Sequence, residues 1–249
     1  MRSYVDILDS EEIKKEKLIQ ADYESDQNCI KMILDISFNI FKSYDAVLTV
    51  EGEIENEFYQ MGLSLIYKNI NYLYTAYKLT GIGQYSVARL TFRNVYESLI
   101  ILKANAIKSD LGLLEKWKSG ENINLKANVF RKVDSPNSRS MLNFWDYLCK
   151  LTHSTKYSIQ TMFDYKKEEV DLNYTFILIL LYLNFHVLNR YIANRSLDAK
   201  VDRLIITEEG SSLKEQRDGL KKAFSLIKKE HSKETRSVIN DFCKVWRFK

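Results

Sequence analysis

Turn-forming residues are scarce in this chain of 249 residues, which contains 8 glycines and 1 proline. Average usage in globular proteins is about 7% glycine and about 5% proline, so both counts are low. Sandwiches, barrels and propellers need these residues at their many turns, and the counts nearly exclude such folds. With 45% hydrophobic and 28% charged residues, the chain is also too apolar to be globally disordered. We therefore expect an all-α fold, a helical bundle with long antiparallel core helices and a C-terminal basic helical extension.

Apolar residues recur at helical spacing along most of the chain. This spacing predicts core helices over residues 29–44, 54–79, 84–108 and 172–194, and shorter helices over 111–118 and 141–151. The turn at Gly81-Ile82-Gly83 separates two of the long helices. A turn this short predicts that these two helices pack as antiparallel neighbours.

The segments around these helices are more polar. Residues 1–24 are rich in charge, and we expect a peripheral helix there that opens near Ser10. Residues 119–138 contain the sole proline and several asparagines, which predicts a surface loop. Ser138 or Ser140 is then the expected N-cap of the helix that follows.

The C-terminal fifth of the chain differs in charge from the rest. We divide the chain into a helical bundle, residues 1–198 with a core over about 29–194, and a basic amphipathic tail, residues 199–249. The tail contains 13 Lys and Arg and 8 Asp and Glu, a net charge of +5, whereas the whole chain has a net charge of +4. Its apolar stripe should dock on the bundle or on a partner protein, with the cations outward. The stripe consists of Leu213, Leu220, Phe224 and Ile227.

RNA is another expected partner of these cations. Each phosphate that a cation neutralises makes binding more sensitive to salt. We therefore expect weak, salt-sensitive RNA binding by the full chain, which largely disappears on truncation after Asn194.

The sequence has no feature of a metal site, an exported protein or a membrane protein. The three cysteines, Cys29, Cys149 and Cys243, are far apart, and no Cys/His cluster has zinc spacing. No nucleotide-binding or hydrolase motif is present, so we expect no metal and no cofactor. The N-terminus lacks a secretory signal, which makes the cytoplasm the expected location. The apolar run 174–183 is shorter than the roughly 20 residues of a membrane span, and we interpret it as a central bundle helix.

Three charged residues follow one another at intervals of four within a largely apolar helix. Arg89, Arg93 and Glu97 lie on one stripe, because four residues nearly complete a helical turn. Charges on such a helix occupy its one exposed strip or are paired inside a polar site. The sequence leaves both interpretations open.

A second group of candidate residues surrounds His153. The helix before it is anchored to the core by Met141, Trp145 and Leu148, and His153 follows its last turn. An imidazole titrates near neutral pH, as a general acid or base requires. Lys150, one turn earlier, and Lys156, just beyond, could hold an anion beside it. A lone histidine is more commonly structural, and both roles stay open.

The same residues carry a resemblance to a family. Arg93-x-x-x-Glu97 on a long helix, followed by Tyr147-Leu-x-x-Leu-x-His153-Ser154, resembles uncharacterised HEPN-like helical proteins of bacteria over about residues 55–190. The usual signature of the family, an arginine a few residues before a histidine, does not precede His153. The resemblance implies a homodimer and a metal-independent RNA endonuclease of a toxin–antitoxin or antiphage defence system.

A ribonuclease would give these residues definite roles. His153 would be the general acid or base, and Arg89 or Arg93, oriented by Glu97, would stabilise the charged phosphorane. The expected substrate-binding residues are Tyr96, Tyr147, Lys150 and Lys156.

Two other functions remain open at this stage. In a non-catalytic interaction or regulatory subunit, the Arg/Glu/His set is a structural network and the tail docks a protein partner. In a nucleotide or small-molecule sensor, Arg93, Tyr96 and Trp145 line a pocket. A homodimer is expected in each case, because 16 Tyr and 12 Phe on helices leave apolar surface to cover.

Overall fold

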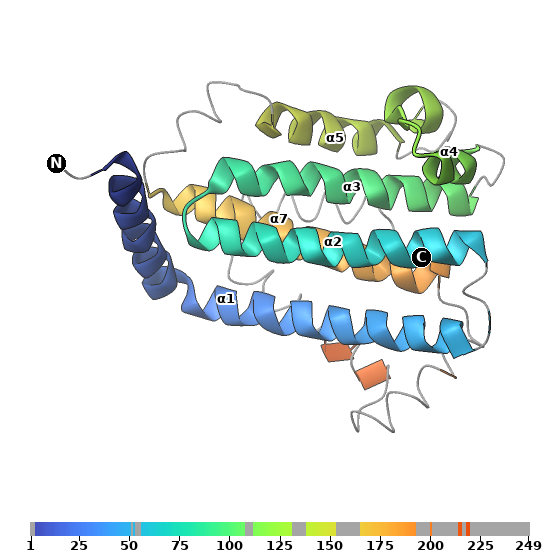
Figure 1. The fold of residues 1–249 in the computed structure, drawn as a ribbon, viewed down its shortest axis with the longest axis horizontal. Coiled ribbons are helices and arrows are strands. Elements are labelled where there is room, and N and C mark those ends of the chain that lie inside the picture. Colours follow the sequence, from blue (N-terminus) through green and yellow to red (C-terminus); the bar gives the residue numbers. More distant parts are fainter. Residues whose placement is uncertain are drawn as a thin grey trace.

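The chain forms an all-α bundle in a computed structural model (Figure 1). The structure describes residues 3–50, 52, 56–107, 112–130, 138–152, 165–192, 200, 214–215 and 218–219. None of these described residues lies in a β-strand, and the predicted fold class is confirmed. The boundary predicted at residue 198 is not tested, because most of the tail lies outside the described residues.

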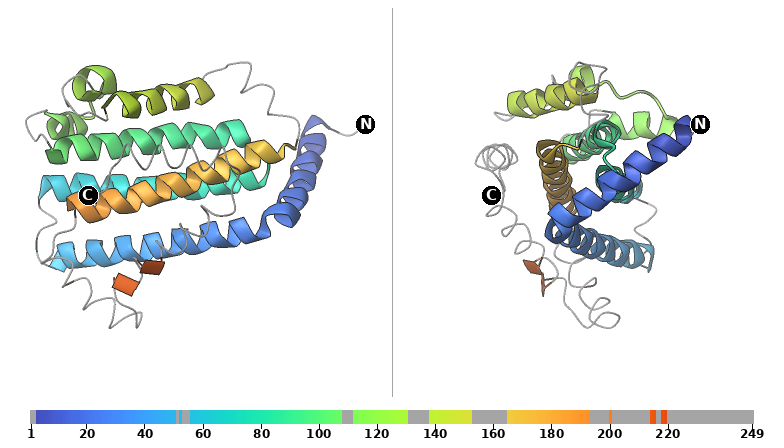
Figure 2. Two further views of the ribbon diagram at one scale, coloured as in Figure 1. Left: turned by 180° about the vertical axis from the view of Figure 1, so that it is seen from behind. Right: turned by 90° about the vertical axis from the view of Figure 1, so that its left-hand side faces the viewer.

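Four long helices form the body of the bundle. They are α1 (Tyr4–Val50), α2 (Glu57–Gly81), α3 (Tyr85–Ile107) and α7 (Lys167–Val187). Figure 1 shows α1, α2 and α3 side by side, with α7 behind them, and Figure 2 shows α7 in front from the opposite side. Helix α7 packs on all three, so it is the central helix of the bundle.

Shorter elements complete the bundle. Helix α5 (Ser138–Thr152) lies along the outer side of α3, next to α4 (Leu113–Ser119) and the π-helical segment η3 (Leu125–Phe130) (Figure 1). A second π-helical segment, η4 (Leu188–Ile192), continues α7.

The turn between α2 and α3 confirms the prediction of antiparallel neighbours. Gly83 has φ +80°, a backbone conformation that residues with a Cβ rarely adopt. Its amide donates to the carbonyl of Thr80 at 3.0 Å, and the next amide, of Gln84, donates to the carbonyl of Leu79 at 2.8 Å. Glycine at this position therefore ends α2 and directs the chain back along it.

Helix α1 begins earlier than predicted. Ser3, not Ser10, provides the cap: the Ser3 Oγ accepts from the Asp6 amide at 3.1 Å, and the Asp6 carboxylate accepts from the Ser3 amide at 3.0 Å. This reciprocal pattern is a capping box with aspartate in the acidic position. The first part of α1 is also less peripheral than expected, because Ile19 is fully buried.

A kink in α1 lets both of its parts contact the bundle. Tyr23 has non-helical angles, φ −131° and ψ 24°, and the N-terminal part turns away from the rest of the helix there (Figures 1 and 2). The N-terminal part contacts the α2–α3 turn, where the Gln84 amide nitrogen donates to Glu12 at 2.6 Å.

The described part of the predicted loop, residues 119–130 and 138, is less loop-like than predicted. The segment η3 forms a π-helical turn within them, and Leu125 and Val129 are buried against the core. Apolar burial therefore outweighs the local preference of the asparagines for loops. Helix α5 already includes Ser138, and α7 starts at Lys167, five residues before the predicted start at Leu172.

Helix α7 has the composition of a membrane span. Continued through Arg190, it has a mean hydropathy of 1.4 over its most apolar 18-residue window. Of this window, 78% is buried inside the bundle. One such helix is weak evidence for a membrane span, because the core helix of a bundle has the same composition. The central position predicted for this segment is confirmed.

Candidate functional site

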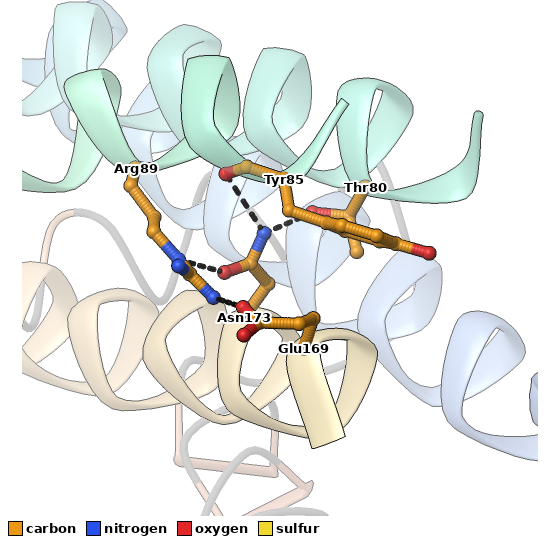
Figure 3. Close-up of polar contacts among 5 residues, drawn as sticks. All are labelled: Thr80, Tyr85, Arg89, Glu169 and Asn173. Carbon is orange, nitrogen blue, oxygen red and sulfur yellow. Dashed lines mark hydrogen bonds and ion pairs between the residues drawn. The ribbon is translucent and has the colours of Figure 1, made fainter. Parts of the chain in front are cut away.

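Arg89 lies in the interior between α3 and α7. Its side chain is 2% exposed, and its Nε donates to the Oδ1 of Asn173 at 2.9 Å (Figure 3). Its Nη2 forms an ion pair with the carboxylate of Glu169, one turn before Asn173 on α7. A buried guanidinium is tolerated only when it is paired and hydrogen-bonded, and α7 supplies both partners.

Asn173 extends this network to the α2–α3 turn. Its side chain is fully buried, and its Nδ2 donates to the Oγ1 of Thr80 and to the carbonyl of Tyr85, both at 3.2 Å (Figure 3). One asparagine therefore joins the end of α2, the start of α3 and α7. The contacts fix how far α7 can slide along the other two helices.

Tyr147 lies within electrostatic range of the Arg89–Glu169 pair. The Glu169 side chain is 21% exposed, so the pair is partly accessible to water. Burial raises the pKa of the Tyr147 phenol, and the charges of Arg89 and Glu169 act on it in opposite directions. The Tyr147 ring also lies 6.1 Å from that of Phe176, which anchors this part of α5 to α7. Tyr147 is thus a predicted site residue that the structure brings beside Arg89.

Glu97 is the centre of a second cluster, between α3 and α5. Its Oε1 accepts two hydrogen bonds, from the Nε of Arg93 and from the Nε1 of Trp145, each at 2.8 Å. The bond to Glu97 raises the pKa of Arg93. The Arg93 and Glu97 side chains are 33% and 24% exposed, so the pair is neither a surface pair nor a fully buried one.

Cations surround the indole of Trp145. The Arg93 guanidinium lies 5.6 Å and the Lys126 ammonium 5.1 Å from the ring, both within cation–π range. Lys126 also pairs with Asp146 at 3.2 Å. These contacts attach α5 and η3 to α3.

The remaining predicted residues are scattered or lie outside the described part of the chain. Tyr96 is fully buried, donates to the carbonyl of Met141 at 3.2 Å and packs edge-on against Phe144. Its side chain therefore lies in the core of the bundle. Lys150 is exposed on α5. His153 and Lys156 lie outside the described residues.

Sequence reasoning missed the partners of Arg89. Glu169 and Asn173 are separated from it by 80 and 84 residues, and neither belongs to a motif. One signal was available: Asn173 stands at the start of the long apolar run of α7, where a polar side chain has to find a buried partner.

The other end of α7 contains His186. Burial lowers its pKa to about 3, and the positive charges of Arg190 and Lys103 add to this effect. His186 is thus neutral at pH 7. Its side chain is half-buried in the last turn of α7. Nearby, Asn69 donates to Asn184 at 3.0 Å in a fully buried contact between α2 and α7.

We expect His186 to make the protein less stable at mildly acidic pH. Below its ordinary pKa of about 6.5 the unfolded chain binds a proton that the folded chain refuses until about pH 3, so stability falls as the pH falls through this range. The slope from this one group is at most about 1.4 kcal/mol per pH unit. Denaturation of the wild type and of His186→Gln at several values from pH 7.5 to 4.5 measures it. Parallel curves for the two proteins would show that His186 does not contribute.

The Arg93–Glu97 pair should have an intermediate effect on stability. We expect Arg93→Ala and Glu97→Ala each to lower the free energy of unfolding by about 1–3 kcal/mol, as for hydrogen bonds to charged groups that are half-buried. Chemical denaturation measures both losses, with Lys118→Ala as the control, because its ion pair with Glu57 is exposed. Losses below about 0.5 kcal/mol for both variants would show that the Arg93–Glu97 pair behaves as an exposed surface pair.

Within the described residues, no group of three or more His, Cys, Asp or Glu side chains could hold a metal ion. Comparison of the chain with protein-family models, with curated proteins and with solved structures finds no match. What the two clusters do must therefore be inferred from their own contacts.

Proposed function

We propose that this chain is a non-catalytic, HEPN-like interaction or regulatory module, in which Arg89, Arg93 and Glu97 hold helices together. The observation that carries the proposal is the state of Arg89, whose guanidinium is 2% exposed and bonded to Asn173 and Glu169. An arginine with these contacts stabilises the packing of α3 on α7.

The geometry is unfavourable for phosphate chemistry at the two arginines. A cation that stabilises a phosphorane must lie within hydrogen-bond distance of it and must not be committed to another anion. The carboxylates of Glu169 and Glu97 already pair with Arg89 and Arg93. Breaking the buried pair to admit a phosphate costs about 3–5 kcal/mol, which binding would have to offset.

Exposed apolar side chains support a role in association. Met32 and Phe38 on α1 and Tyr67 and Tyr74 on α2 are 38–51% exposed. The expected homodimer stays a prediction, and light scattering at tens of micromolar tests it. A monomer at that concentration would contradict the predicted homodimer.

A ribonuclease is the second candidate, favoured by the register of α5 on α3. Trp145 contacts Glu97, and one turn later the charge of Arg93 acts on Cys149. Because α3 and α5 run antiparallel, one further turn brings the end of α5 to the level of Arg89 on α3. The end of α5 lies at the same end of the bundle as the starts of α3 and α7 (Figure 1). His153 is the next residue in the sequence.

One experiment separates the two candidates. Purified full-length protein is incubated with total RNA in EDTA, beside His153→Ala and, as a matched control, His231→Ala. We expect the RNA to stay intact with all three proteins. Cleavage by the wild type and His231→Ala but not by His153→Ala would contradict the proposal and establish the ribonuclease. Cleavage by all three would show that His153 is not required; activity that persists at constant specific activity through a further purification step would contradict the proposal, and activity that is lost in that step belongs to a contaminating nuclease.

A further inference from the structure

The first part of α1 covers the end of the bundle at which α2 turns into α3. We call this part, residues 4–22, the arm, and it turns away from the rest of α1 at Tyr23 (Figures 1 and 2). The Lys15 side chain lies across the turn, so close that a Cβ at Gly83 would come within 2.6 Å of its Cδ. Lys15 is 8% exposed and Ile19 is fully buried. The arm is therefore packed against the bundle.

The end of the arm is also bonded to the start of α7. The Asp22 carboxylate accepts from the phenol of Tyr165 at 2.5 Å and pairs with the Nζ of Lys167 at 2.9 Å. The phenol of Tyr23 donates to the backbone carbonyl of Lys167 at 3.1 Å. The surface that receives the arm is thus built by the α2–α3 turn and the start of α7, and the arm reaches it through the backbone at Tyr23.

The sequence around the kink favours a continuous helix. Sharp kinks usually occur at proline, at glycine–serine pairs or at π-bulges. Residues 4–50 contain no proline and no glycine, yet Tyr23 has non-helical angles. The contacts of the arm with the bundle therefore impose the kink. A straight α1 of 47 residues, about 70 Å long, is a second conformation that the sequence permits.

The arm has more apolar surface than its own bundle covers. Large apolar side chains that are 41–62% exposed follow one another along it, namely Val5, Ile7, Leu8, Ile13 and Leu18. Exposed apolar side chains that gather in one segment usually mark a site of association. A second copy of the chain has the same apolar segment, so two arms that lie beside each other would cover it.

We propose that two copies of this chain bind each other by exchanging their arms. In each copy α1 straightens at Tyr23, and its arm occupies the α2–α3 turn and the start of α7 of the other copy. The arm fits this surface, because it occupies the same surface of its own chain when α1 is kinked. Exchange thus keeps the contacts of the arm and adds contacts between the straightened helices, which makes it a low-cost route to a dimer.

The inference rests on the association expected in the proposed function, and it names the segment that passes between the copies. A dimer without exchange would form through another surface, such as the exposed rings of Phe38 and Tyr67. The exchange is independent of whether the chain cleaves RNA. Its test therefore has to distinguish an exchanged dimer from a dimer of kinked chains.

Cross-linking of mixed labels makes this distinction in the full-length chain. Isotopically light and heavy copies are unfolded together in equal amounts, refolded and separated into monomer and dimer by size-exclusion chromatography. A carbodiimide then joins the carboxylate of Asp22 to the ammonium of Lys167, because these groups are 2.9 Å apart and their side chains are 36% and 65% exposed. In the dimer, about half of the linked peptides should combine a light and a heavy half, since exchange makes each link intermolecular. The monomer should have none.

The ion pair of Glu57 and Lys118 is the matched control. It joins α2 to α4 without involving the arm, and its side chains are 52% and 48% exposed, so the carbodiimide reaches it as well. We expect its linked peptides to combine halves of the same label in both fractions.

Substitutions at Glu24 test whether α1 straightens. Glu24 is exposed beside the kink, so its replacement leaves the contacts of the arm in place. Glycine is less favourable than alanine inside a helix by a factor of about five, and the exchanged dimer has two straightened helices. The association constant of Glu24→Gly should therefore be about 25-fold lower than that of Glu24→Ala. Circular dichroism checks the fold of both variants, and equal association constants would contradict a straightened α1.

The other outcomes each have a definite meaning. A dimer in which all Asp22–Lys167 links combine like labels would overturn the exchange and leave the homodimer standing. A chain that stays monomeric at every concentration at which it dissolves would contradict both. Mixed labels in the Glu57–Lys118 links in the same proportion would trace the mixed links to random contacts and overturn the inference. RNA cleavage in EDTA would contradict the non-catalytic function and leave the exchange untouched.

Discussion

Replacing Glu169 with alanine is expected to lower the free energy of unfolding by about 3–5 kcal/mol. The change leaves the Arg89 guanidinium, which is 2% exposed, without its carboxylate partner and with a hydrogen bond to the neutral side chain of Asn173 (Figure 3). A buried charge without a counterion is one of the most costly defects that a single substitution creates. Chemical denaturation followed by circular dichroism measures the loss.

Glu168→Ala is the matched control for this prediction. Glu168 is in the same first turn of α7 but exposed, so its loss removes only a favourable interaction with the helix dipole, about 0.3–1 kcal/mol. If both variants lost less than about 1 kcal/mol, the Arg89–Glu169 pair would not be part of what holds the bundle together.

The second large effect is expected at Phe176. This side chain of α7 is fully buried and lies within 6.1 Å of the rings of Phe92, Phe144 and Tyr147, so it connects α7 to both α3 and α5. Phe176→Ala should lower the free energy of unfolding by about 3–5 kcal/mol, through lost apolar burial and the cavity that remains. Denaturant titration with a folded-state control by near-ultraviolet circular dichroism measures it.

Phe38→Ala is the same substitution at a less buried position and serves as the comparison. It is 38% exposed on α1, and its ring lies 6.3 Å from Phe41 and Tyr67. We expect Phe38→Ala to cost about 0.5–1.5 kcal/mol, the value of such aromatic contacts. Equal losses at Phe176 and Phe38 would mean that α5 is not anchored through Phe176.

Local signals in the sequence were sufficient for the long helices. The spacing of apolar residues located α2 and α3, and the glycines at 81 and 83 located their turn, because both features act within a few residues. The start of α1 was placed too late, because its capping box uses aspartate at Asp6 in place of the usual glutamate or glutamine. Residues 125–130 were assigned to a loop because their buried partners are distant in sequence.

The candidate site could be predicted only in part. The stripe of Arg89, Arg93 and Glu97 followed from helical periodicity, and the structure shows that its members belong to two clusters. Arg93 finds its partner four residues away, so that pair was visible in the sequence. Arg89 pairs with Glu169 across 80 residues, and tertiary packing alone brings them together. No local pattern distinguishes Glu169 from the exposed Glu168 beside it.

Arg89 and Glu169 act together to hold α3 on α7, and a double-mutant cycle measures their coupling. Unfolding free energies are measured for Arg89→Ala, Glu169→Ala and the double variant. We expect the double variant to lose less than the sum of the two single losses, by about 1–3 kcal/mol, because the second substitution removes a group whose partner is already gone. Losses that add to within about 0.5 kcal/mol would mean that the two residues do not interact in the folded protein, and would contradict the structural role assigned to Arg89.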